Sequence, residues 1–153
     1  MTMSGGLSDQ DWAIRLHIYG YFVARGRPPT SEEVASHFRL EEAEVRAAFH
    51  RLHDHHALFL DPGTDVIRMA NPLSAVPTAY RVRVGDRGLW ANCAWDSLGI
   101  PAMLDADARV EAILPTTGEA VNYAVEKGKL KADPFVVHFP LPFARWYDDL
   151  QHT

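Results

Sequence analysis

The chain has 153 residues, with 15 Lys+Arg against 20 Asp+Glu and a formal net charge of −5. Apolar residues make up 47% and charged residues 23%, which is a globular composition and excludes a wholly disordered chain. The acidic balance argues against a nucleic-acid partner held through its phosphates, and no apolar run reaches the roughly 20 residues that span a bilayer. Cys93 is the only cysteine, which excludes an internal disulfide and favours a reducing cytoplasm.

Three helices and a hairpin are predicted at the start of the chain. The first helix begins at Ser8 and the second at Thr30, because each is followed three residues later by an acidic side chain, as in a capping box. Apolar spacing predicts a third helix over residues 41–55. Residues 57–60 and 65–69 flank an Asp-Pro-Gly-Thr turn and predict a β-hairpin. Three helices followed by a hairpin are the order of a winged helix-turn-helix, which predicts a winged-helix-like domain over residues 8–70.

The charges of this predicted domain bear on whether it reads DNA. Between Pro28 and Pro72 there are four basic and eight acidic residues, and three of the acidic ones begin the third helix. A winged helix that reads DNA presents basic side chains on this helix. The count favours a module used for packing, while a regulator that uses a few well-placed arginines stays open as the alternative.

A second domain is predicted over residues 78–153, after a proline-containing linker that begins near Asn71. It contains a short helix over residues 91–100, ended by Pro101, and closes with an aromatic helix over residues 143–150. Four strands are predicted, over residues 80–84, 109–114, 120–125 and 135–139. The predicted fold class is therefore α+β, with the winged helix packed on a small α/β domain.

Histidines cluster at the end of the third predicted helix. The four side chains are those of His50, His53, His55 and His56. Imidazoles can bind zinc or nickel, but these lack a regular ligand spacing, and a helix C-terminus favours protonated histidine in any case. The cluster is therefore interpreted as solvated, with a metal site as the alternative. His138, within the predicted strand over residues 135–139, is interpreted as structural.

Cys93 and Asp96 form the most informative pair. If a helix starts near Asn92, Cys93 lies in its first turn, where free N–H groups and the helix dipole favour a thiolate. Asp96 follows at the third position and shares that helix face. A thiolate can capture a soft metal or electrophile, and a carboxyl beside it can accept or deliver a proton. The alternative is an inert, buried cysteine beside an aspartate that caps the helix.

A resemblance to a known family rests on residues 93–102. Their sequence, Cys-Ala-Trp-Asp-Ser-Leu-Gly-Ile-Pro-Ala, resembles the Cys-Ala-x-Asp-x-Leu-x-x-Pro-Ala signature of the alkylmercury lyases. Residues 30–52 are similar to that family's N-terminal winged helix, and Thr117-Gly118 falls where the family has a Thr-Gly turn. The resemblance covers about residues 27–126 and implies a winged helix joined to a small α/β domain with antiparallel strands.

The resemblance also implies an activity. These enzymes cleave the carbon–mercury bond by protonolysis, without a bound cofactor, and external thiols remove the mercuric ion. Cys93 would be the thiolate that takes the mercury, and Asp96 would meet the same metal and pass a proton to the departing carbon. The expected partner is then a small organometallic or soft-metal ligand, with no nucleic acid and no membrane. Trp90 and Trp95 are candidate walls of the pocket.

The chain departs from the family in one respect. The family uses a second catalytic cysteine, well C-terminal to the first, whereas this sequence has only Cys93. A short family member and a fold retained for another purpose both fit this departure. Two alternatives to a lyase follow: a transcriptional regulator that senses a metal or electrophile through Cys93, and a non-catalytic binding module.

Overall fold

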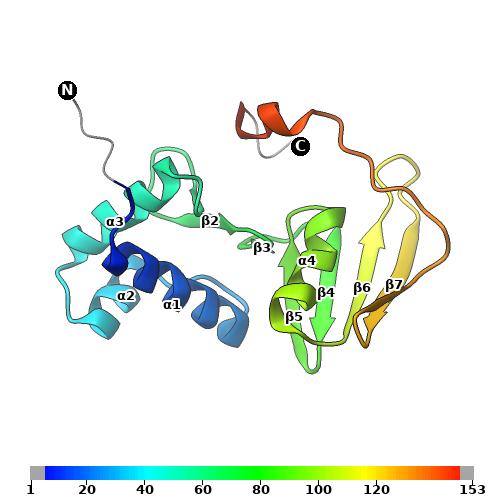
Figure 1. The fold of residues 1–153 in the computed structure, drawn as a ribbon, viewed down its shortest axis with the longest axis horizontal. Helices are drawn as coiled ribbons and strands as arrows, with labels where there is room; N and C mark the ends of the chain where they lie inside the picture. The colour runs from blue at the N-terminus through cyan, green and yellow to red at the C-terminus, as the bar shows by residue number, and fades with distance from the viewer. Residues whose placement is uncertain (1–5, 149–153) are drawn as a thin grey trace.

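The structure, a computed structural model, describes residues 6–148. Its first elements are the helices α1 (Asp9–Arg25), α2 (Ser31–Phe38) and α3 (Glu42–Asp54), which gather at one end of the molecule (Figure 1). Ser8 and Thr30 cap α1 and α2 through complete capping boxes, as predicted. All three helices therefore begin within one residue of their predicted starts.

An antiparallel sheet follows the helices. Its strands are β1 (Phe59–Leu60), β2 (Ile67–Ala70), β3 (Leu73–Ser74), β4 (Tyr80–Val84), β5 (Arg87–Ala91), β6 (Ala108–Ile113), β7 (Ala120–Glu126) and β8 (Lys129–Lys131). They lie in the order β1-β2-β3-β5-β4-β6-β7-β8, and every neighbouring pair is antiparallel. Helices with an antiparallel sheet make the fold α+β, as predicted.

The helix α4 (Ala94–Leu104) lies against the middle of this sheet, in contact with β4, β5 and β6. Ile100 of α4 is fully buried, together with Val82 and Val110 of the facing strands. The same continuous core extends into the N-terminal helices, where Phe22 and Phe49 are fully buried. Apolar burial therefore fixes α4, and the residues at its N-terminal end, on the sheet.

Two predictions for the segment before and within α4 are wrong. Arg87–Ala91 forms β5, which pairs with β3 and β4, where the sequence predicted a turn followed by a helix. The helix does not end at Pro101 but continues to Leu104. Proline lacks the N–H that would bond the carbonyl of Ser97, yet its own φ is helical, and both Ile100 and Pro101 are buried against the sheet. Packing thus outweighs the lost hydrogen bond.

The C-terminal segment also differs from its prediction. Residues 135–139 form no strand, and among residues 6–148 no strand pairs with them. From β8 the chain passes around the outer end of the sheet and returns over α4 toward the N-terminal helices (Figure 1). It ends there in the 3₁₀ helix η1 (Phe143–Asp148), in place of the longer helix predicted to residue 150, and residues 149–150 lie outside the described range. None of the helices in the described part of the chain is both long and apolar enough to cross a membrane.

Candidate active site

Cys93 lies at the N-terminal end of α4. It is the N-cap residue, one position before the first turn, and its backbone is extended with φ −149° and ψ 179°. Its Sγ accepts a hydrogen bond from the backbone N–H of Asp96 at 3.4 Å, as a serine or threonine cap would. The sulfur therefore faces the unpaired N–H groups of the helix terminus.

Asp96 lies on the first turn of α4, on the same side as this sulfur. Its Oδ2 accepts a hydrogen bond from Nδ2 of Asn92 at 3.2 Å. Both side chains are half-buried and line one cavity of about 70 Å³. The cavity residues are Met69, Asn71, Asn92, Cys93, Trp95, Asp96, Phe139 and Trp146. A sulfur and a single carboxyl group thus face one small space.

The pKa of Cys93 differs from the expectation that its thiolate is favoured. The pKa of the Cys93 thiol is raised, first by burial and then by the neighbouring Asp96 carboxylate, although backbone N–H groups act in the opposite direction. The position at a helix terminus predicted a favoured thiolate, but the loss of solvation outweighs it. Burial likewise raises the pKa of Asp96, against the hydrogen bonds from Asn92 and Cys93. Both groups are therefore held toward their protonated forms.

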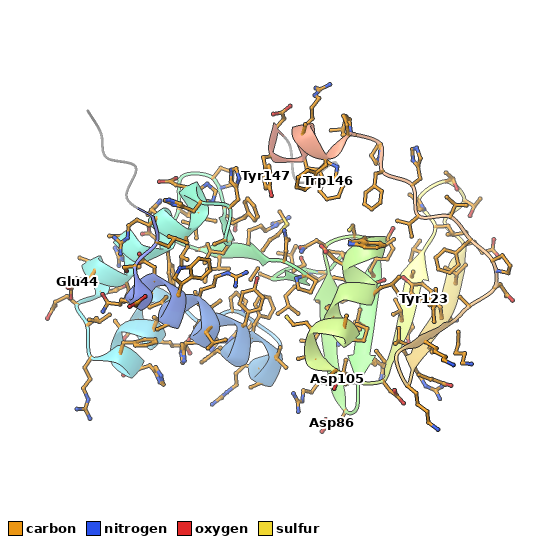
Figure 2. The ribbon with its side chains drawn as sticks, in the orientation of Figure 1. Glu44, Asp86, Asp105, Tyr123, Trp146 and Tyr147 are labelled. Atoms are coloured by element: carbon orange, nitrogen blue, oxygen red, sulfur yellow. The ribbon has the colours of Figure 1, made fainter. Side chains whose placement is uncertain are left out.

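Four other residues that line the cavity are apolar, namely Met69, Trp95, Phe139 and Trp146, and only Trp95 belongs to α4. Phe139 stacks on Trp146 with ring centroids 5.1 Å apart, and it meets Trp95 edge-on at 6.4 Å. Figure 2 shows Trp146 and Tyr147 projecting from η1 toward the body of the molecule. Tyr147 stacks on His56 at 3.9 Å, which holds η1 to the end of α3. The C-terminal segment therefore supplies two of the four apolar walls.

The two tryptophans proposed as pocket walls have different positions. Trp95 lines the cavity and is 58% exposed. Trp90 does not line it and instead carries the Arg81 guanidinium over its ring, at 4.5 Å from the centroid. A Cβ at Gly88 would collide with that guanidinium, so glycine there leaves room for the stacking. Trp90 is thus part of the sheet surface rather than of the site.

The histidine cluster does not converge. His50 bonds Asp65 at 2.7 Å, the ring of His53 accepts from the backbone N–H of Leu60, and His56 stacks on Tyr147. Across residues 6–148 no three histidine, cysteine or acidic side chains are grouped as metal ligands would be. His138 is exposed and lies outside any strand, so the prediction of a histidine inside a strand is wrong.

The structure adds residues to the site that the sequence did not indicate. Asn71 and Asn92 hydrogen-bond to each other beside Asp96, and Phe139 and Trp146 close the cavity. Asn92 directly precedes the Cys-Ala-Trp-Asp motif, and this position is the one signal in the sequence that indicates it. The other three lie 22 or more positions from Asp96, and no local pattern marks them.

Comparison with known proteins bears on what this cavity is. The family model described as alkylmercury lyase matches residues 73–152, which is more than half of the chain and includes Cys93 and Asp96. The chain belongs to the alkylmercury lyase family.

The fold is shared with a protein of known structure. The crystal structure of the mercury-bound form of MerB2 superposes with a TM-score of 0.66 at 24% sequence identity, over 81% of this chain and 59% of that chain. The chain thus spans about three-fifths of the length of that MerB2 chain. No curated protein matches the sequence.

Proposed function

We propose that this protein cleaves the carbon–mercury bond of organomercurials by protonolysis, with Cys93 as the sulfur that takes the mercury and Asp96 as the proton donor. The observation that carries the proposal is that the side chains of Cys93 and Asp96 line one cavity, with Cys93 Sγ held by a 3.4 Å hydrogen bond from the backbone N–H of Asp96. Membership of the alkylmercury lyase family supports the same chemistry. Both side chains would meet the metal of the substrate.

The raised pKa values suggest how the proton moves. The organomercurial exchanges its leaving ligand for Cys93, forming the sulfur–mercury bond as the S–H bond breaks, and Asp96 accepts the released proton. Asp96 then protonates the carbon, the carbon–mercury bond breaks, and its electron pair forms the new carbon–hydrogen bond of the hydrocarbon. A carboxyl whose pKa is raised by burial suits this role because it holds a proton to a higher pH than an exposed carboxyl does. Mercuric ion remains on Cys93.

The apolar side chains of the cavity would bind the organic group of the organomercurial. Met69, Trp95, Phe139 and Trp146 surround the polar pair. Contact with these side chains removes apolar surface of the substrate from water and keeps water away from the carbon that is protonated. Trp95 keeps its proposed role as a wall, and Phe139 and Trp146 join it.

The second thiolate that the family uses has no counterpart in the 153-residue sequence, in which Cys93 is the only cysteine. We propose that an external thiol supplies it and then removes the mercuric ion, with no bound cofactor involved. A reducing cytoplasm provides such thiols and keeps Cys93 reduced.

The N-terminal part is proposed to be a winged-helix-like domain over residues 8–70, followed by the lyase-like domain over residues 78–153. Three helices and the hairpin β1–β2 support this division. Three arginines of this N-terminal part pair with carboxylates: Arg46 with Glu42, Arg51 with Asp11 and Arg68 with Asp61. Arginines paired in this way are not available for phosphates, which favours a packing role over DNA recognition.

Release of benzene from phenylmercury tests the proposal. The protein is incubated with phenylmercury and an excess of a small thiol, and benzene is measured by gas chromatography against a protein-free blank. Cys93→Ser is the matched control and is expected to release none. Stoichiometric mercury uptake that depends on Cys93, without benzene, would leave a binding module, and a DNA shift reversed by mercury would indicate a regulator.

A further inference from the structure

The amide of Asn92 lies between two other polar side chains. Its Nδ2 donates to Oδ1 of Asn71 at 2.9 Å and to Oδ2 of Asp96 at 3.2 Å, and the backbone carbonyl of Leu73 lies at 3.3 Å. Two N–H groups thus serve three acceptors from two segments, residues 71–73 and the first turn of α4. Asp96 is held by one of its two carboxyl oxygens, which fixes the direction of the other.

The orientation of this amide is determined by its surroundings. Its other end, Oδ1 of Asn92, is buried without a hydrogen-bond partner in the described part of the chain. Turning the amide over would place Oδ1 against the three acceptors and would replace their hydrogen bonds with repulsion. Leaving an acceptor buried and unpaired costs stability. The arrangement therefore keeps a donor on Asp96 at the expense of an orphaned oxygen.

Asn71 connects this arrangement to the N-terminal helices. Its backbone carbonyl accepts a hydrogen bond from the Tyr19 hydroxyl of α1 at 2.7 Å. The same hydroxyl accepts from Nη2 of Arg15 at 3.1 Å. A continuous chain of hydrogen bonds thus runs from α1 through Asn71 and Asn92 to Asp96, which lies on α4.

We propose that Asn92 is a positioning residue for Asp96 in the reaction, and that Asn71 acts only through Asn92. The inference rests on the proposed function, because it assigns Asn92 to the placement of the proton donor. A carboxyl that can rotate in its pocket spends less time in line with the carbon that it protonates, whereas one held at Oδ2 keeps its direction. The N-terminal helices thereby contribute to a site whose sulfur and carboxyl both lie at the end of α4.

Three variants and a control test the proposal on the full chain. Asn92→Ala is expected to lower kcat for phenylmercury about 10-fold, the usual scale for a lost partner of a site residue. KM and mercury uptake by Cys93 stay unchanged, because the sulfur and the apolar walls are intact. Asn71→Ala keeps the backbone carbonyl that bonds Tyr19 and is expected to lower kcat by less. Asn122→Ala, an exposed asparagine on β7, is the matched control and leaves kcat unchanged.

The double variant Asn71→Ala/Asn92→Ala decides whether the two residues act in series. Its kcat is expected to equal that of Asn92→Ala alone, whereas multiplied losses would show that Asn71 acts independently and would overturn the proposal. Unchanged kcat in Asn92→Ala, or a loss carried by KM alone, would overturn it as well. Absence of benzene from the wild-type protein would instead refute the proposed function.

A spectroscopic measurement that needs no turnover accompanies the kinetics. In ¹⁵N-labelled protein, the side-chain NH₂ resonances of Asn92 are expected to shift in Asp96→Ala and in Asn71→Ala, while those of Asn122 stay in place. Resonances of Asn92 that do not move in either variant would show that the contacts are absent and would overturn the proposal. This result stands even if Asn92→Ala fails to fold.

Discussion

Replacing Asp96 by asparagine separates a proton donor from a structural carboxylate. Asparagine has the same shape and keeps an oxygen that can accept from Asn92 Nδ2, so the cavity should persist. Asp96 is the one carboxyl group among the residues that line the cavity, which leaves no neighbour there to replace it as an acid. Turnover should therefore fall by about 10²-fold, which is about 2.7 kcal/mol in activation free energy.

The thermal stability of the Asp96→Asn variant should not fall along with its turnover. Burial raises the folded-state pKa of Asp96, so the ionised form is penalised in the fold. The stability that its protonated form contributes is present below the ordinary value of 3.8 and is lost as the pH rises through the raised pKa. At pH 7 the asparagine variant should thus unfold at the same or a higher temperature than the wild type.

The assay for this variant measures benzene release at saturating phenylmercury, mercury bound per protein and a thermal melt. We expect full mercury uptake, a melting temperature that is not lowered, and the 10²-fold loss of turnover. Turnover within about twofold of the wild type would refute the reasoning, because asparagine and aspartate serve about equally at a helix terminus.

Three further predictions follow from the same structure. Alkylation of Cys93 by iodoacetamide should show a pH midpoint above the ordinary thiol value, because burial and then the Asp96 carboxylate raise the pKa of the thiol. Asp96→Asn should lower that midpoint, and a midpoint that does not move in the variant would contradict the influence of Asp96 on Cys93. Trp146→Ala should raise KM for phenylmercury about 3- to 10-fold, as expected for a lost aromatic contact, and an unchanged KM would exclude Trp146 as a wall. Arg51→Met should lower the free energy of unfolding in urea by about 1–3 kcal/mol at pH 7. Burial raises the pKa of Asp11, but hydrogen bonds from Arg51 and Ser8 outweigh it and lower that pKa. The loss of stability in Arg51→Met should therefore vanish as the pH falls below 3.8 through the lowered pKa. A loss that persists in acid would contradict the assignment.

The helices and most strands could be predicted because their signals are local. Ser8 and Thr30 mark helix starts through residues only three positions away, and the alternation over residues 80–84 matches β4. β3 and β5 were missed because their pairing depends on each other and on β2 and β4, not on a pattern of their own. β8 was missed because its three residues are exposed and pair only with β7.

The segment of residues 135–139 shows how alternation can mislead. Its aromatic side chains contact other rings and not a neighbouring strand: Phe135 meets Tyr123 at 5.2 Å, and Phe139 stacks on Trp146. Val136, between them, is 88% exposed. The pattern therefore reflects contacts between aromatic side chains, of which Phe139 lines the cavity, and periodicity alone cannot distinguish such contacts from a strand.

The residues of the site likewise fall into those that the sequence predicts and those that only the fold reveals. Three-residue spacing predicted that Cys93 and Asp96 share a helix face, and both line one cavity. Asn71 and Trp146 come from segments more than 20 residues away on either side, so only the folded chain brings them to Asp96. The raised pKa of the Cys93 thiol also depends on burial by these segments, which the sequence does not encode locally.

The central claim is that the Cys93–Asp96 cavity protonates the carbon bound to mercury, and the isotope content of the product tests it most directly. Phenylmercury is incubated with the protein and an excess of a small thiol in D₂O, and benzene is analysed by mass spectrometry. Protonolysis predicts benzene that carries one deuterium, released by the wild type and not by Cys93→Ser. Benzene without deuterium, or no more benzene than the thiol alone produces, would contradict the account.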